Sequence, residues 1–162
     1  MTIEFRKDYT YSMVVPTSMG GRLTPVSGQP VHSSKTFILE ASSAESNVAS
    51  VSSYLGLPVK VLTTFVKGSP IARFIKDDLA GRHMDYEAKE VEQGGPWGYR
   101  HQFNLADSGL GSRGPRVQND RAGEVGSGGW RKWGQVRGVR RNAARWANPP
   151  GRIVTPPCRS GS

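Results

Sequence analysis

The central part of the chain alternates short apolar runs with amphipathic stretches. Residues 36–39 and 59–66 are rich in β-branched and aromatic side chains, which is typical of β-strands. Between them, residues 44–55 carry apolar side chains at near-helical spacing, and Gly56 ends the run. The predicted apolar face of this helix consists of Ala44, Val48, Val51 and Leu55.

Both predicted helices have N-terminal signals. Ser42 and Glu45 have the spacing of a capping box, in which the serine accepts from the amide of the third helical residue and the glutamate returns to the serine amide. For the second helix we expect Ser69 as the N-cap, Pro70 in the first turn and Gly81 at the end. The apolar face of that helix is predicted to consist of Ile71, Phe74, Ile75 and Leu79.

This order of elements predicts an α/β fold. Strand, helix, strand and helix in succession favour a parallel sheet with right-handed crossovers. The N-terminal region is polar and broken by glycine and proline, with one strand candidate at residues 11–15. After His83 the chain changes to extended pieces at 86–91, 97–105 and 115–118, which we expect to form antiparallel strands of a small sheet or lid.

Charge divides the chain after Val125. The first 125 residues carry 14 Lys and Arg against 13 Asp and Glu, whereas residues 126–162 carry 8 Lys and Arg and no acid. Gly and Pro make up 11 of those last 37 residues, a share typical of segments that do not build a core. We therefore expect a folded portion at 1–125 and an irregular basic tail at 126–162.

Three interpretations of the tail remain open. Its arginines alternate with Trp130, Trp133 and Trp146, and such a combination pairs with phosphate and stacks on bases in nucleic-acid-binding arms. A solvated basic tail without a specific role has the same composition. Arg, Gly, Trp and Pro without any acid are also what a GC-rich coding sequence yields when it is read out of frame.

Other classes of function have little support. The single cysteine argues against a disulfide framework, no apolar stretch is long enough to span a bilayer, and no secretory signal opens the chain, so we expect a cytoplasmic protein. His32, His83 and His101 have no partner at metal-ligand spacing. Residues 109–114 match G-x-G-x-x-G, but Pro115 follows where a dinucleotide site needs a helix, which indicates a coincidence.

Five short sequence motifs follow one another along the chain in a fixed order. Residues 43–49 read SAESNVA, 55–63 LGLPVKVLT, 81–85 GRHMD, 93–100 QGGPWGYR and 116–123 RVQNDRAG. The first three resemble the N-terminal half of ribokinase-like (PfkB-type) sugar kinases, and the last two look most like the lid of 2-keto-3-deoxygluconate kinases. The resemblance covers about residues 10 to 125. It implies a partial ribokinase-like three-layer core with a small β-lid.

The resemblance also implies a sugar-acid site. Relatives hold the sugar at the start of the first helix, where Ser42 and Ser43 stand in place of the family's paired glycines, and the lid supplies contacts to carboxylate and hydroxyls. Simple capping and a solvated surface are the alternatives for these residues. Because the family's lids often make dimer contacts, a homodimer is also expected. The predicted substrate-binding residues are Ser42, Ser43, Asn47, Tyr99, Arg100 and Arg121.

The family's catalytic base and ATP pocket lie in its C-terminal half, at a G-A-G-D motif that nothing after Val125 resembles. Phosphoryl transfer needs a positioned base and electrostatic stabilisation, so we assign no catalytic residue and no metal ligand. ATP and Mg²⁺ are expected for the parent kinase, and this chain is expected to be inactive alone. A frameshift or truncation of a longer kinase accounts for both the missing motif and the charge break. The alternative function is a small nucleic-acid-binding protein that uses the tail.

Overall fold

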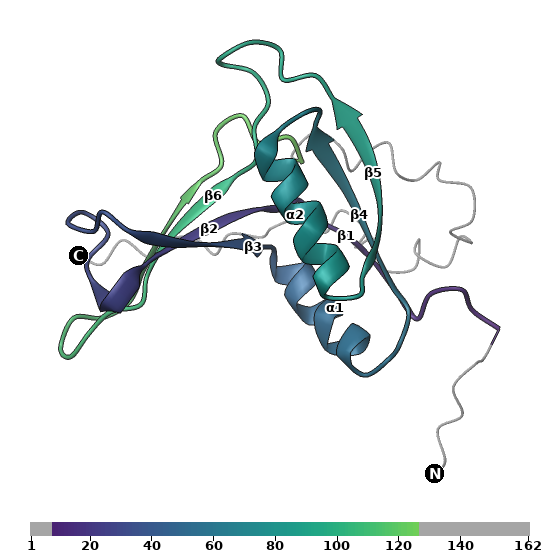
Figure 1. Cartoon of the computed structure of the whole chain (residues 1–162), viewed down its shortest axis with the longest axis horizontal. Helices are drawn as coiled ribbons and strands as arrows, with labels where there is room; N and C mark the ends of the chain where they lie inside the picture. The colour runs from purple at the N-terminus through teal and green to yellow at the C-terminus, as the bar shows by residue number, and fades with distance from the viewer. Residues whose placement is uncertain (1–7, 127–162) are drawn as a thin grey trace, which may run out of the picture. The chain divides into compact units, whose positions relative to one another are not determined.

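Two β-sheets, two α-helices and a short 3₁₀ turn make up residues 8–126, the part that the computed structural model describes (Figure 1). The parallel sheet has the order β1-β4-β5, with β1 at Met13–Pro16, β4 at Val59–Val66 and β5 at Asp85–Val91. The second sheet has the order β3-β2-β6-β7, with β2 at Gly20–Pro25, β3 at Phe37–Ser42, β6 at Phe103–Asp107 and β7 at Arg116–Asp120. The 3₁₀ turn is Val26–Gly28.

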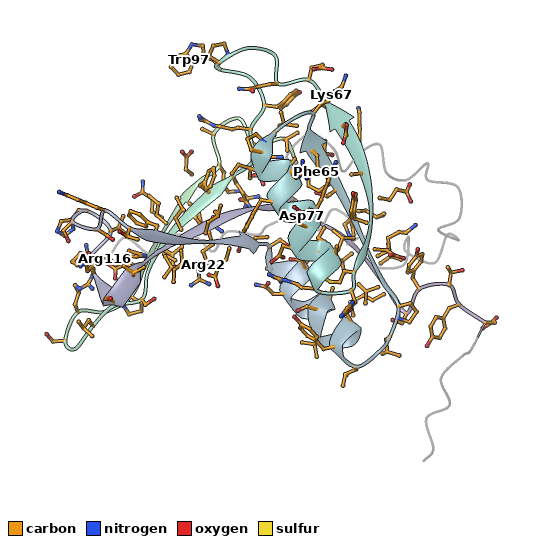
Figure 2. The ribbon with its side chains drawn as sticks, viewed as in Figure 1. Arg22, Phe65, Lys67, Asp77, Trp97 and Arg116 are labelled. Carbon is orange, nitrogen blue, oxygen red and sulfur yellow. The ribbon has the colours of Figure 1, made fainter. Side chains whose placement is uncertain are left out.

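The hydrophobic core lies between β4 and the helices α1 (Ala44–Tyr54) and α2 (Pro70–Gly81). Alternate residues of a strand share one face, and the core face of β4 carries Val59, Val61 and Phe65, each at most 1% exposed. Phe65 lies beside α2 in Figure 2, and its ring meets that of Tyr86 edge-on at 5.9 Å. Burial of each such side chain contributes about 1.5–3 kcal/mol to stability.

The second helix agrees with its prediction. The Ser69 hydroxyl accepts from the Ala72 amide at 3.4 Å, and a proline occupies the first turn, where a missing N–H costs no helical bond. Ile75 and Leu79 are fully buried. Ile71 and Phe74 pack partly buried against the same core, so the amphipathic pattern is confirmed.

The start of the first helix differs from its prediction by one residue. Ser43, not Ser42, is the N-cap, and its hydroxyl accepts from the Ser46 amide at 2.9 Å. Ser42 is the last residue of β3 and pairs with Gly20 across the sheet, so the ladder holds its backbone extended. The capping box with Glu45 is therefore wrong, and the Glu45 carboxylate accepts from the Thr17 hydroxyl at 2.8 Å instead.

The predicted apolar face of α1 is also wrong. Its buried residues are Ser46, Ala49 and Ser53, whereas Val48, Val51 and Leu55 are 64%, 60% and 74% exposed. Small side chains let the helix approach the sheet closely, and the Ser53 hydroxyl donates to the Arg82 carbonyl at 2.7 Å. Close packing and this polar link, rather than the larger apolar residues, decide which face turns inward.

Strand pairing corrects three further expectations. β3 belongs to the second sheet, antiparallel to β2, and not to the parallel sheet. β5, expected among the antiparallel pieces, pairs in parallel with β4 along its whole length. β2 has no counterpart in the sequence prediction, because a strand that starts with Gly20 and Gly21 lacks the usual β-branched signal.

The expected antiparallel lid pair is β6 and β7. The chain enters β6 only at Phe103, because the preceding loop turns through Gly94 and Gly95, both with positive φ. Trp97 lies in that loop and is 95% exposed (Figure 2). The G-x-G-x-x-G stretch is the loop between β6 and β7, so no helix follows it and it is not a dinucleotide site.

Two negative findings apply to residues 8–126. No helix there is long and apolar enough to cross a membrane. Nor does this part bring together three or more His, Cys, Asp or Glu side chains that could hold a metal ion. The predicted basic tail lies outside the described residues from position 127 onward, so its three interpretations stay open.

Candidate functional site

A pocket of about 260 Å³ opens where the start of α1 meets the four-stranded sheet. Ser42 and Ser43 come from the junction between β3 and α1, and Thr17 and Ser18 from the segment between β1 and β2. The segment between β1 and β2 and the junction between β3 and α1, which are far apart in sequence, therefore both line the pocket. The lining residues are Thr17, Ser18, Ser42, Ser43, Ala44, Glu45, Gln102, Asn104, Asn119, Arg121 and Gly126.

One side of the four-stranded sheet supplies amides to this pocket. Asn104 of β6 and Asn119 of β7 are directly paired across the ladder, so their side chains lie on the same face. Alternation along β6 then places Leu105 on the opposite face. The pocket side of the sheet thus carries the two amides, and the opposite side carries Leu105 beside its register partner Gln118.

The start of α1 supplies backbone donors. The Ser43 cap satisfies the Ser46 amide, while the amides of Ala44 and Glu45 belong to the first turn and have no partner inside the helix. The helix dipole adds roughly half a positive charge here. The Glu45 carboxylate also lines the pocket at this helix end, and its negative charge offsets the positive end of the helix dipole.

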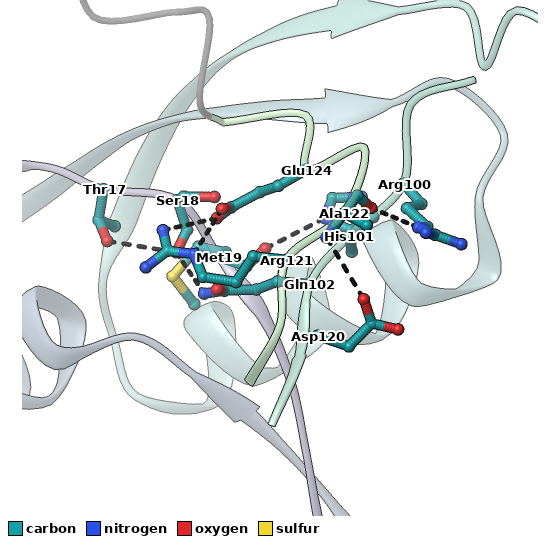
Figure 3. A network of polar contacts seen from close by, with 10 residues as sticks. All are labelled: Thr17, Ser18, Met19, Arg100, His101, Gln102, Asp120, Arg121, Ala122 and Glu124. Atoms are coloured by element: carbon teal, nitrogen blue, oxygen red, sulfur yellow. Dashed lines mark hydrogen bonds and ion pairs between the residues drawn. The ribbon is translucent and has the colours of Figure 1, made fainter. Parts of the chain in front are cut away.

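Among the residues that the structure describes, Arg121 is the only cation of the lining, and it is already paired (Figure 3). Its Nε donates to Glu124 Oε2 at 2.7 Å and its Nη2 donates to Oε1 at 3.2 Å. The Glu124 side chain is 2% exposed, against 59% for Arg121. The bond to Glu124 raises the pKa of the Arg121 guanidinium, and the charge of Glu45 adds to this effect.

Two buried polar atoms at the pocket lack a protein partner. Ser18 Oγ and Asn104 Oδ1 make no hydrogen bond to any residue that the structure describes. An unmade hydrogen bond at a buried atom costs about 1–3 kcal/mol, so such atoms call for a partner beyond the residues that the structure describes. The nearby Gln102 amide donates to the Ser18 carbonyl at 3.5 Å, which leaves the hydroxyl itself available.

His101 joins the two sheets next to the pocket. Its Nε2 accepts from the Val66 amide at 3.3 Å, and its Nδ1 donates to the Met19 carbonyl at 3.2 Å, which assigns the neutral tautomer. Burial lowers the pKa of the imidazole. The ring therefore acts as an uncharged link between the end of β4 and the segment that enters β2.

The structure brings three of the six predicted site residues together. Ser42, Ser43 and Arg121 all line the pocket. Asn47 does not, and its Oδ1 accepts from Arg82 Nη1 at 3.2 Å, which ties α1 to the end of α2.

The other two predicted residues lie in the lid loop outside the lining. Tyr99 is half exposed, and Arg100 Nε donates to the Ala122 carbonyl on the side away from Arg121 (Figure 3). Their side chains therefore belong to the loop that leads into β6. A role for them at a ligand stays a prediction.

Sequence reasoning missed the polar residues of the sheet and of the β1–β2 segment. Ser18, Asn104 and Asn119 lie in stretches without a motif, and their meeting depends on which strands pair. The available signal is an amide at a strand position where alternation would favour an apolar residue. Glu124 was missed because its role appears only through its contact with Arg121.

Comparison with known proteins identifies the fold of this chain. No protein-family model matches the sequence, and no curated protein does. Among solved structures, a 2-dehydro-3-deoxygluconokinase from Thermotoga maritima matches with a TM-score of 0.63 at 21% identity, over 71% of this chain and 33% of that one. The chain has the fold of the N-terminal part of a PfkB-type carbohydrate kinase.

Two further kinase structures agree. A PfkB family carbohydrate kinase from Listeria grayi has a TM-score of 0.59 at 28% identity, over 69% of this chain and 33% of that one. An uncharacterized sugar kinase from Pyrococcus horikoshii in complex with ATP has a TM-score of 0.54 at 16% identity, over 68% and 35%. The chain thus spans about a third of these kinases, and the predicted partial ribokinase-like α/β fold is confirmed.

Proposed function

We propose that this chain is the substrate-and-lid portion of a carbohydrate kinase and that the pocket at the start of α1 binds a sugar. The observation that carries the proposal is the pair of buried, unpartnered atoms, Ser18 Oγ and Asn104 Oδ1, inside a pocket lined by hydroxyls and amides. Sugar hydroxyls both donate and accept hydrogen bonds, so they suit such a lining. The likeness in fold to sugar kinases supports this assignment.

The substrate that the sequence resemblance suggests is 2-keto-3-deoxygluconate or a related sugar acid. The Thermotoga maritima neighbour carries that activity in its name, which makes this compound a first ligand to test. In this reading the Arg121 guanidinium is the partner of the carboxylate, and Ser42, Ser43 and the amides of α1 meet the hydroxyls. A cytoplasmic location is part of the same proposal.

ATP and Mg²⁺ do not fit the residues that the structure describes. Positions 8–126 lack a cluster of three candidate metal ligands, and the glycine-rich stretch 109–114 is a hairpin loop rather than a turn before a helix. One structural neighbour is an ATP complex, which supports ATP as the phosphoryl donor of a complete kinase. We assign no contact to ATP within this chain, and no step of phosphoryl transfer is derived from it.

Calorimetric titration of the full chain tests the sugar site. We expect saturable binding of a sugar or sugar acid from a panel of D-fructose, D-glucose and 2-keto-3-deoxygluconate. Ser18→Ala should weaken binding about three- to tenfold, because it removes a buried hydroxyl that has no hydrogen-bond partner in the described residues and could bond to the sugar. Ser27→Ala, an exposed serine in the 3₁₀ turn, is the matched control and should leave binding unchanged. A folded chain that binds no member of the panel would contradict the proposal.

We also propose that the lid forms a homodimer through a leucine cluster on the sheet face opposite the pocket. Leu23, Leu39 and Leu105 are register partners on one face of the four-stranded sheet and are only half buried. Light scattering coupled to size exclusion should give twice the chain mass. Leu39→Lys should halve that mass, because it places a charge among the three leucines, while Lys35→Glu on the exposed loop should not. A monomeric unaltered chain at micromolar concentration would contradict this.

The nucleic-acid alternative depends on the tail. That segment lies outside the described residues, and no contact within residues 8–126 favours it.

A further inference from the structure

A second cavity lies at the end of the four-stranded sheet where Figure 2 shows Arg116. Its volume is about 470 Å³, which is within the range of small-molecule sites. Leu105 of β6 and Gln118 of β7 line it, and each is next in its strand to Asn104 or Asn119 of the first pocket, so these two pairs face opposite sides of the sheet. Residues 30–32, in the loop after the 3₁₀ turn, line the cavity as well.

The carboxylate of Asp107 fixes one wall of this cavity. Its side chain is 8% exposed, and its Oδ1 accepts from the Gly109 amide at 2.9 Å. Its Oδ2 accepts from Arg113 Nη1, while Nη2 of the same guanidinium donates to the Gly28 carbonyl at 2.6 Å. The Gly109 amide and Arg113 lower the pKa of Asp107, so this carboxylate is charged at neutral pH. These bonds tie the β6–β7 loop to the 3₁₀ turn and hold the wall in place.

Arg116 also lines the cavity, and no acid among the described residues pairs with it. It is directly opposite Asp107 in the β6–β7 ladder, a position at which oppositely charged side chains interact across strands. Both oxygens of that carboxylate are already engaged, however. Within residues 8–126 the Arg116 guanidinium therefore forms neither a hydrogen bond nor an ion pair. Residues 127–162 contain no Asp or Glu that could pair with it.

The lining combines apolar surface with this cation. Pro30, Val31 and Leu105 supply apolar side chains, and the planar guanidinium of Arg116 has the geometry that suits a carboxylate. The negative charge of Asp107 does not oppose an anion strongly, because Arg113 balances it. A ligand that uses both features has a carboxylate at one end and an apolar body at the other.

We propose that this cavity is a second ligand site, which binds a small carboxylic acid with an apolar body through Arg116. The inference goes beyond the sugar site and does not depend on it, because the two cavities share no lining residue in the described part of the chain. Leu105 also belongs to the leucine cluster of the proposed homodimer, so the experiment includes a variant of that cluster.

A matched pair of probes tests the inference. 3-Phenylpropanoate and 3-phenylpropan-1-ol share one apolar body and differ in the terminal carboxylate or alcohol. Titration of the full ¹⁵N-labelled chain, followed by amide chemical shifts, should give saturable changes at Val31 and Gln118. The carboxylate should bind about fivefold more tightly than the alcohol, because a charge-assisted hydrogen bond is stronger than a neutral one. Propanoate, which lacks the ring, should bind at least about fivefold more weakly than 3-phenylpropanoate.

Variants then separate the charge from the rest of the cavity. Arg116→Gln keeps a polar side chain and removes the charge, so the preference for the carboxylate should fall below about twofold while the affinity for the alcohol stays the same. Arg73→Gln, an exposed arginine on α2, is the matched control and should keep the preference. Leu39→Lys should keep it too, because it alters the leucine cluster but no residue that lines the cavity.

Three results would overturn the inference. The first is equal affinity of the unaltered chain for the two probes, and the second is an unchanged preference in Arg116→Gln. Because Arg116 is exposed at the start of an edge strand, this variant should fold, which urea denaturation checks. The third is loss of the preference in a folded Leu39→Lys variant, since a second copy of the chain would then be needed to complete the site. Shifts at Ser18 and Asn104 in place of Val31 and Gln118 would also contradict it, because the acid would then occupy the first pocket.

Discussion

The parallel sheet and the four-stranded sheet bury different kinds of side chain. In β4 the face toward the helices carries the apolar Val59, Val61 and Phe65 with a single threonine, Thr63, and all four are almost fully enclosed. In β6 and β7 the face toward α1 carries Asn104 and Asn119, and a pocket opens there instead of a core. The first sheet buries mainly apolar side chains, whereas the second sets its polar side chains around a pocket.

The largest expected effect comes from removing a large side chain from the core beneath the parallel sheet. Phe65→Ala should lower the free energy of unfolding by about 3–5 kcal/mol, because it leaves a cavity between β4 and α2. Urea denaturation followed by circular dichroism measures the change. Tyr54→Ala, on the 69% exposed outer face of α1, is the aromatic control and should cost less than about 0.5 kcal/mol. Equal losses in both variants would mean that the core lies elsewhere.

A second substitution separates the four-stranded sheet from the parallel one. At Gly20 a Cβ would lie 2.2 Å from Gln102 Cγ and 2.5 Å from the Gln102 carbonyl oxygen, so Gly20→Ala must push β2 and β6 apart. We expect a loss of about 1–3 kcal/mol and weaker sugar binding. Gly81→Ala is the control, because a Cβ there meets nothing and alanine favours the helix, so stability should stay equal or rise. Unimpaired binding by Gly20→Ala would contradict the close approach.

A third measurement examines the link between the sheets. Burial lowers the pKa of His101 below 6.5, the ordinary value for histidine, so the fold prefers the neutral ring. The stabilising effect is complete above pH 6.5 and is lost as the pH falls through the lowered pKa of the folded state. The melting temperature should therefore fall between pH 7.5 and pH 5, and His101→Gln should flatten that dependence relative to His32→Gln, an exposed histidine. Identical pH profiles for the two variants would rule out His101 as the cause.

The smallest expected change in stability comes from a substitution of Asn47, and it tests whether this residue has a structural role or contacts the sugar. Its amide oxygen accepts from Arg82 at a partly exposed site, so Asn47→Ala should cost about 0.5–1.5 kcal/mol of stability. If this contact is its whole role, sugar affinity in the folded variant should match that of the unaltered chain. Arg82→Ala serves as the comparison, because it removes the partner of the same bond. A loss of affinity in Asn47→Ala alone would favour the direct sugar contact that the family resemblance implies.

Local signals in the sequence predicted one helix and its neighbouring strand well. Ser69, Pro70 and the apolar spacing of α2 act within a few residues, so their effect could be read without knowledge of the rest of the chain. The N-cap of α1 could not be fixed in this way, since Ser42 and Ser43 are equally good caps. Pairing of Ser42 with Gly20 in the sheet decides between them.

Sequence motifs led to only some of the residues that line the candidate pocket. Ser42, Ser43 and Arg121 came from the family resemblance, and the structure brings them to one pocket. Ser18 and Asn104 could not be found, because their side chains meet only after β2 pairs with β6. For the same reason, no local pattern indicated that the buried carboxylate of Glu124 accepts from the guanidinium of Arg121.

The pairing of β2 with β6 also has a consequence for folding kinetics. Gly21 and Phe103, which this ladder joins, lie about eighty positions apart, whereas β4, α2 and β5 follow one another directly along the chain. Closing a long loop costs more entropy than closing a short one, so we expect the parallel layer to assemble before the four-stranded sheet. The candidate pocket between α1 and the four-stranded sheet would then form in the last step. A ligand added during refolding would bind only molecules in which the four-stranded sheet has formed. The time course of ligand binding would therefore follow the last step of folding.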